Sequence, residues 1–467
     1  MSAGGDANGG AGGAREVVFS PTCRARRHDL EPPSHRPPTF SAVGLWWGVE
    51  PSPPQHAADP GVKRPLFDAL RADDETEWAG WGDQPVPQFF AEPQAEYAAI
   101  RKACGLTVGF ERGVIRATGK DRLSFLNNLL TNGLVSKETK QPLPVGHGCY
   151  SFLLNLKGRV VADFSVLEAG EEETLLVVER RLAPMLVEAI DRYRFTEKVK
   201  LLDVSDDYET LGLHGPKAIE LLGDAADSEV VFEATPAKFP ATVDLFVTRL
   251  RLGGAGVIAW RDDVCGVPGI GLLVPREASL AVWNDLTTRF GQSLDDRKYG
   301  GRRLRPVGWA MFNACRIEAG RPMVGIDIVP SPPSRPGPKK DDEPAPKGGT
   351  LPAETGPLFK RAVSVVSGCY LGQEVVARMH ARDARAKQIV GIKMLDDALP
   401  AAGAPVEFDD NAVGTITSST LSPVLSAACI ALATVKRPHF EVGTRVVVPA
   451  EGRHAQGEIV ALPFVEG

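Results

Sequence analysis

The chain has 467 residues, of which 43% are hydrophobic and 24% are charged, and its formal net charge is −6. This length predicts roughly two or three domains, and the composition is typical of a globular protein in water. The mild acidity argues against nucleic acid or an anionic membrane as a partner, and no apolar run approaches the ~20 residues that cross a bilayer.

Seven cysteines are spread along the chain, and the nearest two, Cys104 and Cys149, are 45 positions apart. This spacing excludes a CxxC zinc or redox motif and a run of cluster ligands, and it does not suit a disulfide-stapled secreted domain. The eight histidines are scattered. There is also no P-loop, HExxH, GxSxG or well-placed GxGxxG, so we expect no metal site and no dinucleotide or nucleotide site.

Residues 1–85 are dense in Pro and Gly and show no periodicity, which predicts a largely irregular N-terminal extension whose tryptophans can pack on the body. Its first fifteen residues lack the apolar segment of a secretory signal. Three arginines follow, as in a transit peptide, but without an amphipathic helix. We expect a cytoplasmic protein, with the mitochondrial matrix as the alternative.

Residues 86–386 mix strands and helices without regular βαβ alternation, which predicts an α+β fold. Within them, "TGKDRLSFLNNLLTNG" (118–133) has the leucine spacing of a helix that stops at Asn-Gly. Residues 330–357 are rich in Pro and charge and predict a flexible insertion. Residues 387–467 contain short strands separated by turns, which predict an antiparallel β-barrel.

The stretch "VVSGCYLGQEVVARMHAR" (365–382) holds the first candidate site residue, Cys369. Gly372 permits a tight turn into a helix over "QEVVARMHAR", so the cysteine precedes a helix N-terminus, where the helix dipole favours a thiolate. The alternative is a small buried cysteine at the start of an ordinary helix.

Two other stretches combine charge with turns. Arg316 and Glu318 in "CRIEAGRPMVGIDI" either line a site or form an ion pair at a helix end. Asn155 and Asp163 lie at opposite ends of the hairpin-like "LLNLKGRVVADFSV". An aspartate on an otherwise apolar strand either belongs to a site or is satisfied by backbone donors.

Together these pieces resemble one family. "GCYLGQE" is similar to the signature of the YgfZ-type folate-binding proteins, which include mitochondrial iron–sulfur assembly homologues. "TGKDRLSFLNNLLTN", "LLNLKGRVVADF", "LGLHGPKAIELL" and "CRIEAGRPMVGIDI" fall in the order that this family shares with the glycine-cleavage T-protein. The resemblance covers roughly residues 90–467 apart from the insertion, and only "GCYLGQE" is specific to the narrower family.

The resemblance implies two α+β subdomains and a C-terminal β-barrel around a central channel that takes a tetrahydrofolate. It implies an accessory role in the assembly or repair of iron–sulfur proteins, with those client proteins as partners of a monomer. The family's thiol carries over to Cys369. The residues that we expect to bind the folate cofactor are Asn155, Asp163, Arg316, Glu318, Gly372, Gln373, Glu374 and Arg378.

This chain departs from the family in one position beside the thiol. The family usually has Lys-Gly-Cys, whereas this chain has Ser367 in place of the lysine. A cation that could hold the thiolate is therefore missing, and Arg378 is the candidate replacement.

The alternative function is a tetrahydrofolate-dependent aminomethyltransferase of glycine cleavage, which is an enzyme. T-proteins typically carry an acidic pair where this chain has Ala162 and Asp163, and acids where it has Val267 and Gly271. Val and Gly have no carboxylate, so they cannot replace an acid that contacts a folate ring. The resemblance therefore favours the accessory factor, and a third possibility is an interaction protein with a vestigial pocket.

Overall fold

The computed structural model describes residues 63–81, 84–227, 243–291, 303–334, 348–365, 369–382 and 385–466. Most of the expected N-terminal extension, the centre of the expected insertion and Ser367 lie outside these ranges. The described residues include three elements before or at the expected boundary at residue 85, namely α3 (Pro65–Arg71), β1 (Glu77–Trp81) and β2 (Gln84–Phe89). Aromatic contacts fix this segment, because Phe67 lies edge-on against Phe110, with ring centroids 5.2 Å apart.

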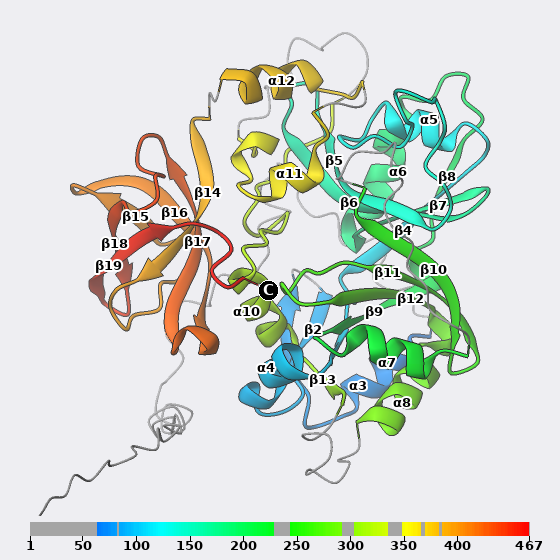
Figure 1. Ribbon diagram of the computed structural model, residues 1–467, viewed down its shortest axis with the longest axis horizontal. Helices are drawn as coiled ribbons and strands as arrows, with labels where there is room; N and C mark the ends of the chain where they lie inside the picture. The colour runs from blue at the N-terminus through cyan, green and yellow to red at the C-terminus, as the bar shows by residue number, and fades with distance from the viewer. Residues whose placement is uncertain are drawn as a thin grey trace, which may run out of the picture. The chain divides into compact units, whose positions relative to one another are not determined.

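An eleven-stranded sheet forms the body of the chain, in the order β13-β3-β9-β12-β11-β10-β5-β6-β7-β4-β8 (Figure 1). Neighbouring strands are antiparallel except β13 and β3. The two halves of the sheet join where β10 pairs with β5. The strands are β3 (Gly105–Val108), β4 (Arg112–Thr118), β5 (His147–Leu154), β6 (Val160–Gly170), β7 (Glu173–Glu179), β8 (Lys200–Asp203), β9 (Tyr208–His214), β10 (Leu245–Leu252), β11 (Ala255–Arg261), β12 (Gly269–Pro275) and β13 (Arg305–Pro306).

Each half of the sheet packs its own helices. α5 (Arg122–Asn127) and α6 (Ala183–Asp191) bury their apolar faces in one core, which includes the leucines of the predicted helix. α7 (Ala218–Ala225) and α8 (Ser279–Phe290) bury theirs in a second core against β9, β11 and β12, and lie together in Figure 1. The remaining helices are α4 (Pro93–Lys102), α10 (Trp309–Glu318), α11 (Leu358–Ala362) and α12 (Gln373–Arg382).

The C-terminal part is a closed six-stranded antiparallel barrel, in the order β14-β17-β16-β15-β18-β19. The barrel has its own apolar core, and its first strand begins at Lys387, as the sequence predicted. The α+β fold with a C-terminal β-barrel is therefore confirmed. Its strands are β14 (Lys387–Met394), β15 (Pro405–Phe408), β16 (Asn411–Ser422), β17 (Ala428–Lys436), β18 (Arg445–Ala450) and β19 (Arg453–Val460).

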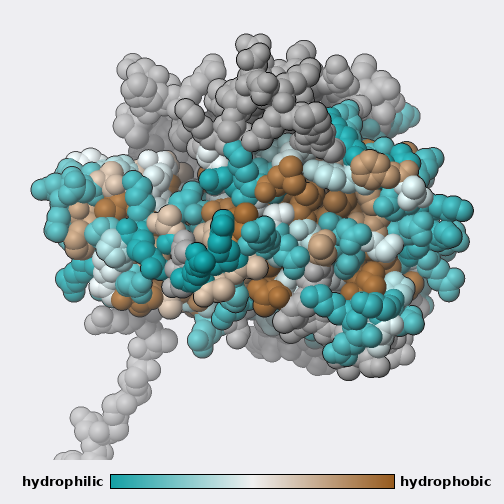
Figure 2. Space-filling model, turned by 90° about the horizontal axis from the view of Figure 1, so that it is seen from above, coloured by the Kyte–Doolittle hydropathy of each residue, from teal (hydrophilic) through white to brown (hydrophobic). Residues whose placement is uncertain are grey.

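The surface drawn in Figure 2 is mostly hydrophilic, with hydrophobic residues in separate patches. Among the described residues, no helix is both long enough and apolar enough to span a membrane.

Candidate functional site

Glycines on two neighbouring strands open a cavity in the side-chain layer of the sheet. Gly212 on β9 lies opposite Gly271 on β12, and His214 lies opposite Gly269. A Cβ at Gly271 would be 2.1 Å from Cζ2 of Trp260, and one at Gly212 would be 2.5 Å from Nε2 of His214. Only glycine therefore leaves room for these two rings, and a cavity of about 120 Å³ remains beside them.

Aromatic rings form much of the cavity wall. Trp309 and Phe312 lie one turn apart at the start of α10, with their ring centroids 5.7 Å apart. Phe312 in turn lies 5.2 Å from the His214 ring. These aromatic faces suit contact with the face of a flat ring.

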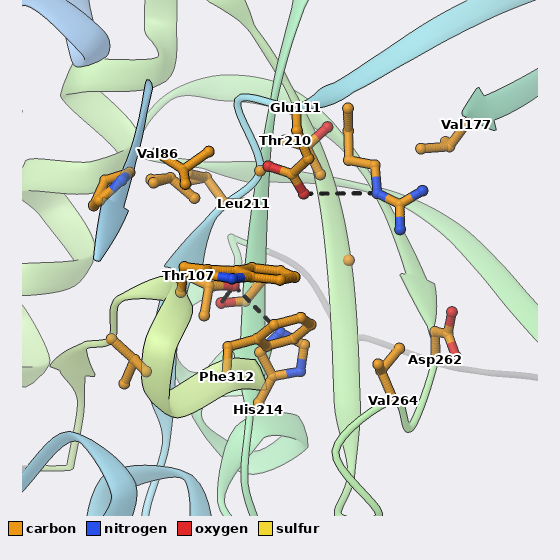
Figure 3. Close-up of a pocket in the computed structure, with 18 of the residues that line it drawn as sticks. Val86, Thr107, Glu111, Val177, Thr210, Leu211, His214, Asp262, Val264 and Phe312 are labelled. Carbon is orange, nitrogen blue, oxygen red and sulfur yellow. Dashed lines mark hydrogen bonds and ion pairs between the residues drawn. The ribbon is translucent and has the colours of Figure 1, made fainter. Parts of the chain in front are cut away.

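One end of the cavity carries a polar pair, Thr107 and His214 (Figure 3). Thr107 Oγ1 lies 3.3 Å from Nε2 of His214 and donates a hydrogen bond to the Gly212 carbonyl at 3.4 Å. Burial lowers the pKa of His214 to about 4, despite the opposing charges of Asp262 and Asp263, so the imidazole is neutral at pH 7. Its Nδ1 is buried without a hydrogen-bond partner among the described residues.

The opposite end of the cavity is charged. Glu111 lies there in Figure 3, and its Oε1 is 3.7 Å from Nε of Arg112, which also lines the cavity. Burial raises the pKa of Glu111, against the opposing charge of Arg112. Burial alone would lower the pKa of Arg112, but the carboxylates of Asp163 and Glu111 outweigh it and keep the guanidinium charged.

A cluster of charged side chains adjoins the cavity. Arg361 on α11 binds Asp262, which lines the cavity, at 2.9 Å, and Asp244 at 2.6 Å. Asp163 accepts a hydrogen bond of 2.7 Å from the Tyr150 hydroxyl. Burial and the Asp163 carboxylate raise the pKa of Tyr150, so its hydroxyl remains a donor. Of the predicted site residues, Asp163 is the one whose charge acts on a residue that lines the cavity, Arg112.

The predicted residues Asn155 and Gly372 meet at a second place. The Asn155 side chain accepts hydrogen bonds from the backbone of Lys157 and Arg159 and so orders the β5–β6 turn. Gly372 has φ of +75°, and a Cβ there would be 2.6 Å from Cα of Gly158 in that turn. The glycine thus lets the start of α12 rest directly on the hairpin.

Cys369 opens onto an outer pocket of about 450 Å³ beside this contact, lined also by Phe125, Leu129 and Tyr370. The thiol is exposed, so it is not the buried helix-start cysteine of the alternative interpretation. The other free cysteines among the described residues are buried, and burial raises the pKa of Cys104 and Cys315 to about 12 each.

The three predicted residues on α12 differ in exposure. Gln373 is half-buried at the helix start, whereas Glu374 and Arg378 are exposed. None of the three lines the cavity or the outer pocket.

Arg316 and Glu318 lie at neither pocket, because both face the barrel from the end of α10. Arg316 pairs with Asp327, which accepts hydrogen bonds from Ser418 on β16 at 2.5 Å. Glu318 accepts a hydrogen bond of 2.5 Å from Ser422 and forms an ion pair with Arg101. Both predicted residues are fully buried, and their observed contacts connect α10 to the barrel.

Sequence reasoning missed most of the cavity residues. Thr107, Trp260 and Asp262 carry no motif, and they meet only through strand pairing between distant segments. "LGLHG" did contain a signal, because a histidine between glycines on an apolar strand is unusual. Among the described residues, no group of three or more His, Cys, Asp or Glu side chains could hold a metal ion.

Comparison with known proteins gives a consistent family. Residues 74–332 match the GCVT N-terminal domain, and residues 387–466 match the glycine cleavage T-protein C-terminal barrel domain. The chain is 26% identical over 401 residues to an aminomethyltransferase of Staphylococcus carnosus, covering 85% of this chain and 96% of that protein. It is 24% identical over 404 residues to an aminomethyltransferase of Thermoanaerobacter pseudethanolicus, covering 86% of this chain and 97% of that protein.

A solved structure has a similar fold. The glycine cleavage system aminomethyltransferase T from Bartonella henselae superposes with a TM-score of 0.67 at 19% identity, covering 87% of this chain and 98% of that one.

Proposed function

Because the chain belongs to the glycine-cleavage T-protein family, we propose that it binds a tetrahydrofolate with the pterin ring in the cavity of Figure 3. The observation that carries this proposal is a cavity with aromatic walls and an unpartnered buried nitrogen at His214. A buried polar atom without a partner costs free energy, which a bound polar ring would recover. The residues present therefore fit the group.

For the role of the bound folate, we propose that the chain is an accessory factor for iron–sulfur proteins that uses the thiol of Cys369. Two features support this role. Cys369 is exposed in an open pocket, where a partner protein can reach it. Where T-proteins carry a glutamate on this strand, this chain has Gly271. The Trp260 ring fills the space that a side chain at position 271 would need. One thiol can supply one ligand at a shared interface, not a whole cluster site.

Aminomethyl transfer in glycine cleavage is the second candidate, and the comparisons favour it. The relatives described above are named aminomethyltransferases and match along most of their length. The chain also keeps one carboxylate of the family's acidic pair, Asp163, oriented by Tyr150. A carboxylate in this position could orient an amine or take up a proton.

Three measurements on the full chain separate these functions. Calorimetry with tetrahydrofolate tests the binding proposal, and failure to bind would overturn it. Glycine-cleavage activity with a lipoyl carrier protein would favour the enzyme and overturn the accessory role.

The third measurement is complementation of an iron–sulfur enzyme activity in cells that lack the protein. We expect Cys369→Ala to lose complementation and Cys429→Ala, which removes a buried barrel thiol, to keep it. A fully active Cys369→Ala variant would contradict the proposed use of this thiol.

A further inference from the structure

His214 is a buried residue of the cavity, and one of its two ring nitrogens has no hydrogen-bond partner among the described residues. Its side chain is only 6% exposed, and it lines the cavity. Nε2 is engaged by Thr107, whereas Nδ1 has no hydrogen-bond partner among the described residues. In Figure 3 the His214 ring lies against Phe312, with Nδ1 toward the side where Val264 and Asp262 stand.

Thr107 can make both of its hydrogen bonds at the same time only when Nε2 of His214 carries the proton. The threonine hydroxyl has one hydrogen, and it donates that hydrogen to the Gly212 carbonyl at 3.4 Å. Its oxygen can then only accept from Nε2–H, which leaves Nδ1 as an acceptor. Because burial lowers the pKa of His214 to about 4, this neutral form persists at physiological pH.

The neighbouring backbone keeps this acceptor accessible. A Cβ on Gly269, directly across from His214 on β12, would lie 3.2 Å from Nδ1. The same Cβ would lie 2.3 Å from the carbonyl oxygen of Asp262, so the backbone itself requires glycine here, and the glycine also leaves Nδ1 uncrowded.

We propose that Nδ1 of His214, held by Thr107, accepts a hydrogen bond from a ring N–H of the ligand and so selects a flat heterocycle that carries such a donor. This inference rests on the proposed folate binding, since a pterin ring has several N–H groups at its edge. In this chain the polar contact to the ring would come from β9, because Gly271 on β12 has no side chain to offer. The aromatic walls would contact the faces of the same ring.

The test measures tetrahydrofolate affinity by calorimetry on the full chain at pH 7.5, for wild type and three variants. His214→Phe keeps a ring but removes the acceptor, and we expect binding to weaken about 10-fold. His214→Asn returns an amide oxygen near the position of Nδ1 and should recover part of the loss. His147→Phe changes a buried histidine that does not line the cavity and should bind like wild type.

Each outcome has a separate meaning, once circular dichroism shows that all variants are folded. If wild type does not bind, the folate proposal itself fails. If wild type and His214→Phe bind equally well, folate binding stands and the role of His214 fails. If the Phe and Asn variants are equally weak, the loss comes from packing rather than from a hydrogen bond, which also overturns the assignment.

Discussion

At the residue scale, Gly271 and Trp260 depend on each other in the wall of the cavity. The two residues are paired across β11 and β12, and the indole occupies the space where any side chain at position 271 would begin. The absence of a side chain at Gly271 on β12 thus leaves room for the Trp260 ring on β11.

We predict that Gly271→Ala destabilises the protein by about 1–3 kcal/mol, because the added Cβ would overlap the Trp260 ring. In a Trp260→Ala background the same substitution should cost much less, which a double-mutant cycle by urea unfolding measures directly. Gly256→Ala on β11 is the matched control, since nothing lies within 4 Å of its Cβ. Equal costs in both backgrounds would show that Trp260 does not restrict this position.

His214 should make stability depend on pH. Its pKa of about 4 in the folded state lies below the ordinary 6.5, so between these values the unfolded chain binds more protons. Stability is therefore complete above pH 6.5 and falls as the pH drops toward 4. At pH 5 the loss from this group amounts to about 2 kcal/mol.

The measurement is the free energy of unfolding in urea at pH 7.5 and pH 5. His214→Asn should lose about 2 kcal/mol less than wild type on acidification, while His454→Asn, at an exposed barrel position, should behave like wild type. Identical losses in wild type and His214→Asn would mean that the imidazole is already accessible to protons in the folded state.

At the scale of elements, α10 has two separate roles. Its first turn supplies Trp309 and Phe312 to the cavity, and its last turn supplies Arg316 and Glu318 to the contacts with the barrel. A single helix therefore contacts both the candidate site and the C-terminal domain.

We predict that Arg316→Met destabilises the protein by about 3–5 kcal/mol, because it leaves the fully buried Asp327 without its cation. Arg303→Met is the matched control, since the acids that pair with Arg303 are largely exposed, and it should cost less than about 1 kcal/mol. Urea unfolding gives both values. Similar losses in the two variants would contradict the structural role assigned to this pair.

Local sequence patterns predicted elements better than they predicted the site. Leucine spacing indicated the helix around α5, and short strands with turns indicated the barrel from Lys387. The proximity of Asn155 to Gly372 was not visible, because 217 positions separate them and only tertiary packing brings them together. Arg316 and Glu318 were predicted to bind a ligand, but each forms a buried ion pair with another residue of the chain. The residue types alone do not distinguish these two roles.

At the scale of the whole molecule, the cavity lies between two separately packed cores. The residues that line it come from β3, β9, β11 and β12 in one half, and from β6 and β7 in the other. Cross-strand pairing between β10 and β5 is short, with two residue pairs. A ligand in the cavity would therefore touch both halves across a junction that has few backbone hydrogen bonds of its own.

We predict that tetrahydrofolate slows amide hydrogen exchange in both halves of the sheet. A ligand at 100 times its Kd adds about 2.7 kcal/mol to the folded state, which slows exchange up to about 100-fold for amides that exchange only when the cavity opens. Protection should appear at β9 and β12 and also at β6 and β7, with less change in the barrel, from which no described residue lines the cavity. Mass spectrometry of wild type and His214→Phe under the same ligand concentration provides the comparison. Protection confined to residues 369–382 would instead place the ligand in the outer pocket beside Cys369.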